Sequence, residues 1–137
     1  MPVALSSKPV LTLAAARQIS DAAEAEALRN EWHVSIAIVD DAGRLLHFSR
    51  MDGSTNASVD IAIAKAQHAA NYRRDTRFHE DVLRDGGLPL LRLPGTLPLE
   101  GGLRLLVGGI VVGGIGVSGV QAVQDGLIAQ AGLSVLM

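Results

Sequence analysis

A chain of 137 residues, of which 48% are apolar and 19% charged, has the size and composition of one compact domain. A formal net charge of −2 gives no electrostatic basis for binding nucleic acid or an anionic membrane surface. The absence of cysteine excludes disulfides, a thiolate nucleophile and a zinc–thiolate site.

The first ten residues are expected to form a loose arm ahead of a single domain that spans residues 11–137. The arm lacks a basic stretch followed by an apolar core, so no secretion signal is expected and the cytoplasm is the default location. Thr12 is a typical helix-capping residue. The helical spacing of the alanines and Ile19 behind it predicts a helix from Leu13 to about Asn30.

Two apolar runs, residues 34–39 and 45–51, predict strands joined by a turn at residues 40–43. A tight turn between strands implies antiparallel pairing. Strand alternation places three side chains on one face of the returning strand: Leu46, Phe48 and Arg50. Asp52 and Gly53 end this strand.

A second helix is expected from Asn56 or Ser58 to about Arg74, and it presents two different stripes. The stripe expected to face the sheet contains Val59, Ile63, Ala66 and Ala70. The opposite stripe contains Ile61, Lys65, His68 and Tyr72. This mixed stripe indicates a subunit contact or a pocket beside one, and a solvated helix face is the alternative.

A helical turn or two is expected at residues 77–83, followed by a connection that three prolines interrupt between residues 88 and 99. Proline cannot donate a ladder hydrogen bond, so this connection is expected to be irregular with at most one short edge strand. Its leucines are expected to tuck in as a flap: Leu90, Leu91 and Leu93.

The glycine-rich stretch from residue 101 to 119 is the most apolar part of the chain. Gly108-Gly109 between two apolar runs predicts a β-hairpin with strands at residues 103–107 and 110–117. Glycines 113, 114 and 116 indicate a bulge or tight packing against a helix, or alternatively a wall against a ligand. This stretch is too short and too close to Arg104 to span a membrane.

A last helix is expected from Val120 to Ala131, with Gly132 ending it. The order of elements therefore predicts an α+β fold in which helices flank a single antiparallel sheet.

Four stretches resemble the GlcG/HbpS-like proteins, a haem-degrading-domain family: VSIAIVDDAGRLLHFSRMDG, SVDIAIAKAQHAA, LEGGLRLLVGGIVVGGIGVSG and VQDGLIAQAGL. The resemblance runs from about Leu11 to Leu136, and its most specific pieces are residues 50–53, 65–66 and 115–119. It implies a profilin-like sheet, symmetric homo-oligomers, and haem, iron or corrinoid binding in some members. Other members accompany catabolic operons. Residues 73–76 and the proline-rich connection depart from the family pattern, which favours a ligand other than haem if they form the pocket.

A haem-binding accessory role, which the resemblance implies, requires an axial ligand. The chemically suitable side chains are His47, His68, His79, Tyr72 and Met51. Three arginines have the charge and shape to pair with haem propionates: Arg73, Arg74 and Arg77. Covalent haem attachment is excluded because the chain has no cysteine. No spacing of histidines or carboxylates predicts a dedicated metal site.

The alternative hypothesis is a cofactor-free isomerase, tautomerase or hydrolase acting on a small carboxylated intermediate, such as an aromatic ring-cleavage product. Arg50 would hold the substrate carboxylate, and Asp52 or Lys65 would move a proton. The backbone from Gly116 to Gly119 would stabilise an oxyanion or enolate. A neighbouring subunit is expected to complete this concave site. The residues expected to bind the ligand are Arg50, His68, Tyr72, Gly116, Ser118 and Gly119.

Two further interpretations stay open. In the first, Arg50 and Asp52 form an ion pair near a turn that only stabilises the fold. In the second, the chain is an assembly module with no ligand.

Overall fold

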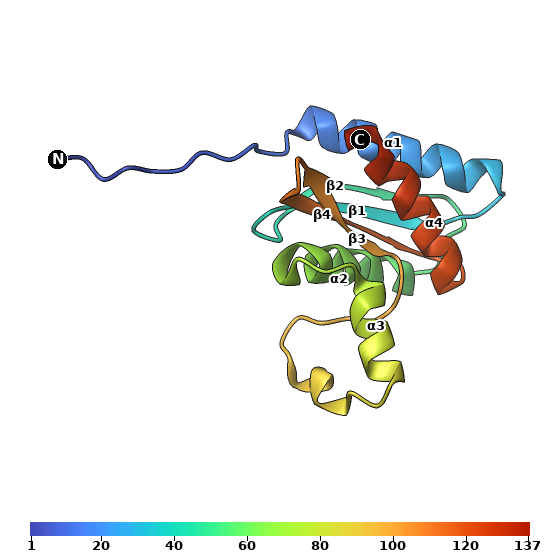
Figure 1. The fold of residues 1–137 in the computed structure, drawn as a ribbon. Coiled ribbons are helices and arrows are strands. Elements are labelled where there is room, and N and C mark those ends of the chain that lie inside the picture. The colour runs from blue at the N-terminus through green and yellow to red at the C-terminus, as the bar shows by residue number, and fades with distance from the viewer.

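The computed structural model describes residues 1–137 and contains one four-stranded antiparallel sheet with helices on both faces (Figure 1). The strands are β1 (Ser35–Asp40), β2 (Leu45–Arg50), β3 (Gly102–Val107) and β4 (Ile110–Ser118), in the spatial order β2-β1-β4-β3. The predicted α+β class is therefore confirmed. β2 and β3 form the two edges of the sheet.

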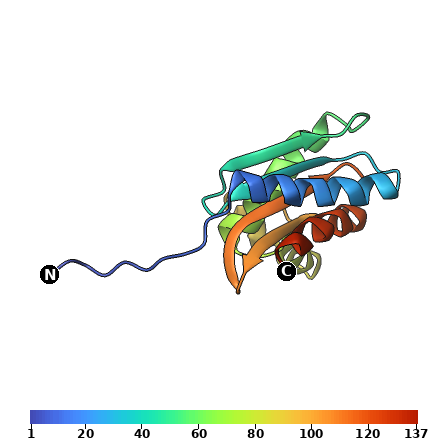
Figure 2. The ribbon, with the colours of Figure 1, turned by 90° about the horizontal axis from the view of Figure 1, so that it is seen from above.

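Four α-helices surround the sheet: α1 (Leu13–Arg29), α2 (Ala57–Tyr72), α3 (Thr76–Arg84) and α4 (Ala122–Leu133). α1 and α4 lie side by side on one face (Figure 2), and α2 covers the other. Two short 3-10 helices, η1 (Leu88–Arg92) and η2 (Ser134–Leu136), complete the set. Thr12 caps α1 as expected, because its Oγ1 accepts a hydrogen bond from Ala15 N at 3.1 Å. None of the helices combines the length and apolar character needed to cross a bilayer.

The two faces of the sheet carry cores of different size. The face under α1 and α4 is packed with large aliphatic side chains such as Ile19, Ile38, Ile115 and Ile128. The face under α2 is packed mainly with small side chains: Ala37, Val39, Ala62, Ala66 and Ala70. Small side chains allow α2 to approach β4 closely.

Two glycines of β4 lie directly beneath α2. A Cβ atom at Gly116 would overlap the Ala62 carbonyl oxygen, and one at Gly114 would overlap the Ala66 carbonyl oxygen. Glycine is therefore required for the close approach of the helix backbone. The expected tight packing of these glycines against a helix is confirmed.

A β-bulge changes the expected faces of β2. Ile38 pairs with His47 and Val39 with Leu45, so Leu46 is the extra residue. An extra residue shifts the alternation by one position. Leu46 consequently packs against the α1 side, whereas Phe48 packs against the α2 side. The prediction that both share one face was wrong.

The hairpin between β3 and β4 has the expected two-residue turn, with φ of +55° at Gly108 and +79° at Gly109. One expectation for a neighbouring segment was wrong. α4 continues past Gly132, which packs against Ile19 and Ile115 instead of ending the helix. The connection before β3 holds η1 and no strand, which agrees with the expectation of at most one short edge strand, and Pro89 suits the first turn of η1.

Only one of the three leucines expected to form a flap is covered. Leu90 is buried, while Leu91 and Leu93 are exposed. η1 turns these two side chains outward, so the flap prediction was wrong for them.

Candidate functional site

The second stripe of α2 is covered by the chain's own elements. Lys65 lies under the start of β3 and of α4, and His68 lies under α3 and the loop that follows it. Both side chains are buried. These two residues are therefore not left for a subunit contact or solvent, which corrects the expectation for them. Ile61 and Tyr72 remain half-buried.

Lys65 and Asp125 form a buried ion pair, with each side chain only 3% exposed. Lys65 Nζ lies 3.1 Å from Asp125 Oδ2 and donates to the Val117 carbonyl oxygen at 2.9 Å. Burial raises the pKa of Asp125 to about 6, although the charge of Lys65 opposes the shift. A Cβ at Gly101 would lie 2.7 Å from Lys65 Nζ, so this glycine makes room for the ammonium group. The pair ties α2, β4 and α4 together.

Asp125 is a buried ionisable residue that was not predicted from the sequence to belong to the site. It lies in the first turn of α4 and its Oδ1 accepts a hydrogen bond from Val120 N at 3.2 Å. An acid in the first turn of a helix is common, because it complements the helix dipole. The position of Asp125 at a helix start was therefore the only feature of the sequence that pointed to it. That position does not reveal that its partner is Lys65, sixty positions earlier in the chain.

The structure brings the sequence-predicted site together only in part. Arg50 and Ser118 both align with Ser35, one on each side of β1, so they lie at the same end of the sheet about 10 Å apart. Lys65 reaches the same end through Val117. Gly116, however, lies beneath α2.

Arg50 is engaged at the start of α2. Its Nη2 donates to Asn56 Oδ1 at 2.8 Å and to the Ser54 carbonyl oxygen at 3.4 Å. Asp52 is exposed and makes no ion pair. The pairing of Arg50 with Asp52 that the sequence left open is therefore not formed.

His68 and His79 form a hydrogen-bonded pair whose direction follows from a third group. His68 Nδ1 accepts a hydrogen bond from Leu97 N at 2.8 Å, and its Nε2 lies 2.6 Å from His79 Nδ1. A ring nitrogen that accepts carries no proton, so neutral His68 carries its proton on Nε2 and donates to His79. His79 must then carry its own proton on Nε2, which has no partner within the chain.

The protonation of the His68–His79 pair determines whether either ring can bind haem iron. Burial, together with the adjacent His79, lowers the pKa of His68 to about 4, and burial followed by the charge of Arg74 lowers the pKa of His79. Both rings are therefore neutral near pH 7, and neither offers a lone pair to iron while the bond from Leu97 is made. The Tyr72 hydroxyl donates to the Pro94 carbonyl oxygen.

The two remaining axial candidates differ in their surroundings. Met51 is packed in the core under α1 and α4. His47 lies on edge strand β2, and its Nδ1 is buried without a hydrogen-bond partner.

Replacing His68 with asparagine is expected to cost about 2–3 kcal/mol at pH 7, because two buried hydrogen bonds are lost. The variant should also lose part of the pH dependence of stability. The pKa of His68 is about 4 in the fold against an ordinary value of 6.5. The unfolded chain therefore binds more protons between these values, and the free energy of unfolding rises with pH in this window.

Urea denaturation between pH 4.5 and 7 measures this contribution as the difference between wild type and variant. The exposed His33 supplies the control His33→Asn. Equal pH slopes in wild type and His68→Asn would contradict the assignment.

Two adjoining cavities, of about 310 and 340 Å³, lie between α3 and α4, and together we call them the α3–α4 groove. Both are lined by Arg77, Glu100 and Val123. Val123 is 61% exposed and Leu127, which lines the larger cavity, is 54% exposed. The groove thus combines uncovered apolar surface with charged groups. None of the cavities is lined by Arg50, Asp52, Lys65 or Ser118.

Of the arginines that line the groove, Arg77 has the weakest ion pair. Arg84, the other arginine that lines the groove, lies 3.7 Å from Glu80 and 3.5 Å from Asp81. The nearest carboxylate oxygen to Arg77 is that of Asp81, at 3.9 Å, on the exposed side of α3. An exposed pair at this distance contributes little, so Arg77 is available to an anionic group.

Comparison with known proteins gives concordant matches. Residues 11–134 match the model of a family described as haem degrading protein HbpS-like. Protein GlcG of Escherichia coli K12 is 38% identical over 114 residues, covering 83% of this chain and 85% of GlcG. A crystal structure of a double mutant of HbpS from Streptomyces reticuli superposes with a TM-score of 0.89 at 36% identity, covering 100% of this chain and 97% of that one. The crystal structure of a PduOC–haem complex gives a TM-score of 0.84 at 29% identity, with 92% and 94% covered.

Proposed function

The chain belongs to the HbpS-like family of haem-degrading proteins, and we propose that it binds haem or a related tetrapyrrole in the α3–α4 groove in an accessory role. The observation that carries this proposal is the combination in one groove of exposed apolar side chains and an available guanidinium group. A tetrapyrrole is a flat apolar ring system with carboxylate substituents. Its plane would pack on Val123 and Leu127, and a carboxylate would bond Arg77.

The residues of the groove fit the macrocycle better than they fit the iron. The groove contains no histidine, tyrosine or methionine. His47 lies on β2, at the opposite edge of the sheet from β3, and so does not reach the groove. Binding would therefore depend on the flat ring system and the carboxylate groups of the tetrapyrrole. Iron-free protoporphyrin is expected to bind about as tightly as haemin.

Replacing Arg77 with alanine is expected to weaken haemin binding about tenfold, because one charge-assisted hydrogen bond is lost. The Soret band of haemin, followed during titration with protein, measures the affinity and the stoichiometry. Val123→Asp should weaken binding further by placing a charge against the ring. Arg17→Ala, on the exposed surface of α1, is the matched control.

Three outcomes of this titration would overturn the proposal. Titration that never saturates would indicate adsorption, unchanged binding by Arg77→Ala would remove the site, and failure of iron-free protoporphyrin to bind would show that the iron is ligated.

The second candidate function is the cofactor-free isomerase or hydrolase built around Arg50, Asp52 and Lys65, which stays a prediction. One observation favours it: the pKa of Asp125 of about 6 gives the Lys65–Asp125 pair a group that titrates near neutrality. Proton transfer requires hydrogen-bond reach to a substrate. Since both side chains are buried, a substrate would have to displace Gly101 or enter from the end of β4. Turnover of small carboxylated compounds that is lost in Asp125→Asn and retained in Arg77→Ala would support this function.

A further inference from the structure

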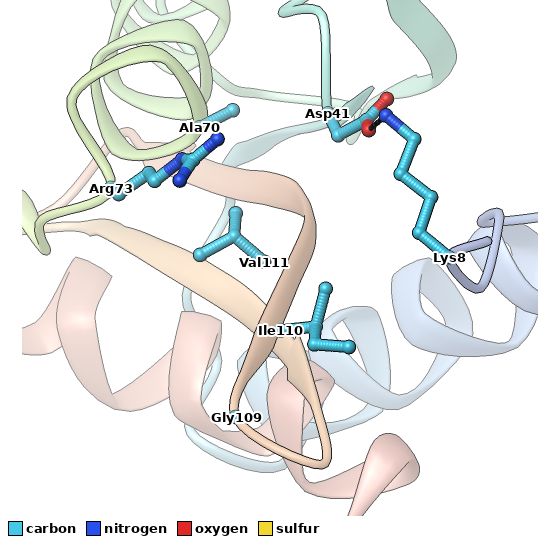
Figure 3. Close-up of a pocket in the computed structure, with 7 residues that line it drawn as sticks. All are labelled: Lys8, Asp41, Ala70, Arg73, Gly109, Ile110 and Val111. Atoms are coloured by element: carbon cyan, nitrogen blue, oxygen red, sulfur yellow. Dashed lines mark hydrogen bonds and ion pairs between the residues drawn. The ribbon is translucent and has the colours of Figure 1, made fainter. Parts of the chain in front are cut away.

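A third cavity, of about 360 Å³, lies at the opposite end of α2 from Arg50 and away from the α3–α4 groove. It is bounded by the end of α2, the β3–β4 hairpin and the N-terminal arm. Its lining is Lys8, Asp41, Ala70, Arg73, Gly109, Ile110 and Val111. Figure 3 shows Lys8 and Asp41 meeting on one side of this cavity and Arg73 on the other.

The charges of this cavity are unequally satisfied. Lys8 is paired with Asp41, whose pKa is lowered chiefly by the hydrogen bond from Lys8. The Arg73 guanidinium makes no hydrogen bond or ion pair, although its charge also contributes slightly to the lowered pKa of Asp41. Two cations and one carboxylate leave one net positive charge. This balance favours a monoanion over a dianion.

The backbone places Arg73 at a position where glycine is usual. Arg73 is the C-cap of α2 and adopts the left-handed conformation, with φ of +51° and ψ of +42°. This conformation costs energy for any residue with a Cβ, and helices commonly end on glycine for that reason. The chain therefore carries a guanidinium here at the expense of stability. Residues in such conformations cluster at active sites and ligand clamps. Glu31, after α1, is the other non-glycine residue with a positive φ, but unlike Arg73 it lines no cavity.

The remaining walls are apolar. Ile110 and Val111 of the hairpin and Ala70 of α2 line the cavity between the charged groups. The outer end is closed by Lys8, and the arm around it is exposed along residues 1–10. A ligand that fits these walls has one carboxylate and a short aliphatic body.

We propose that this cavity binds a small monocarboxylate, whose carboxylate bonds the Arg73 guanidinium beside Lys8 and whose aliphatic body packs on Ile110 and Val111. Guanidinium and carboxylate form bidentate hydrogen bonds, which supply orientation as well as affinity. The site is separate from the α3–α4 groove and does not depend on tetrapyrrole binding.

Butyrate is the probe, and butyramide, which has the same shape without the charge, is its control. Titration followed by amide chemical shifts in ¹H–¹⁵N spectra should move the signals of Ala70, Arg73, Ile110 and Val111 with butyrate, and leave them in place with butyramide. Succinate, a dianion of similar length, should bind more weakly than butyrate. The proposal would be overturned if butyrate moved only signals of residues outside the cavity, if butyramide bound as tightly as butyrate, or if the shifts did not saturate at tens of millimolar butyrate.

Three variants separate binding from folding. Arg73→Ala should lose about tenfold or more in butyrate affinity, because a charge-assisted bond is removed. Arg73→Gly should lose the same affinity while raising the melting temperature, because glycine relieves the left-handed backbone. Arg74→Ala removes the neighbouring guanidinium, which lies over the Phe78 ring instead, and should leave butyrate binding unchanged. Full butyrate affinity in Arg73→Gly would show that the guanidinium has no part in binding.

Discussion

Replacing Lys65 with methionine is expected to destabilise the protein by about 3–5 kcal/mol at pH 7, the largest effect of any single charge removal in this chain. Methionine keeps the length of the side chain but leaves the Asp125 carboxylate buried without its counter-charge. The Val117 carbonyl oxygen also loses its Lys65 donor. Urea denaturation of wild type and variant measures the loss as a difference in the free energy of unfolding.

The pH dependence of this variant identifies the cause. The pKa of Asp125 is raised by burial from its ordinary value of 3.8 to about 6. The folded state therefore binds this proton more readily than the unfolded state, and the free energy of unfolding falls as pH rises from about 4 through 6. Removing Lys65 raises this pKa further. The penalty of Lys65→Met should consequently shrink at pH 5, where the carboxyl group is protonated.

The double variant Lys65→Met/Asp125→Leu is the control for lost packing. Replacing both members of a buried ion pair with apolar side chains is often neutral or stabilising. The double variant should therefore recover most of the stability that the single variant loses. A double variant as unstable as Lys65→Met, or a penalty that stays constant between pH 5 and 7, would contradict the role of the uncompensated charge.

Replacing Gly116 with alanine is expected to destabilise the protein by about 3 kcal/mol or more, because overpacking a site that backbone atoms surround cannot be relieved by a rotamer change. The added methyl group would overlap the Ala62 carbonyl oxygen and press on the Ala66 amide. α2 would have to move off β4 along its length. Urea denaturation measures the loss, and the intensity of the near-ultraviolet circular dichroism reports the loosened packing.

Gly86→Ala is the matched control, since it adds the same methyl group in open space. Gly86 has a φ of +94° and no atom within 4 Å of a Cβ. Alanine there should cost only the conformational penalty, about 1–2 kcal/mol. If Gly116→Ala costs no more than Gly86→Ala, the close approach of α2 does not explain the glycine.

The sequence by itself determined the elements whose physics is local. Thr12 at the start of α1 and Gly108-Gly109 between two apolar runs each act through neighbouring backbone, so their positions follow from a few residues. The order of these elements was enough to predict one antiparallel sheet with helices. The resemblance of nearly the whole chain to one family was likewise a property of the sequence.

The tertiary structure alone decided the features that depend on partners far along the chain. The bulge at Leu46 arises from pairing with β1, so the alternation of β2 by itself misplaces the side chain. The burial of His68 requires α3 and the loop that follows to fold back over α2. The groove available to a ligand likewise exists only because the fold places α3 beside α4 with a space between them.

The Lys65–Asp125 pair shows the physical reason most directly. A helical period identifies which residues share a face, but not whether that face meets water, a subunit or the rest of the same chain. Asp125 approaches Lys65 only after β4 and α4 have packed, and burial then raises its pKa. Charge and burial in this protein are therefore properties of the assembled fold, whereas turns and helix starts are properties of short stretches of sequence.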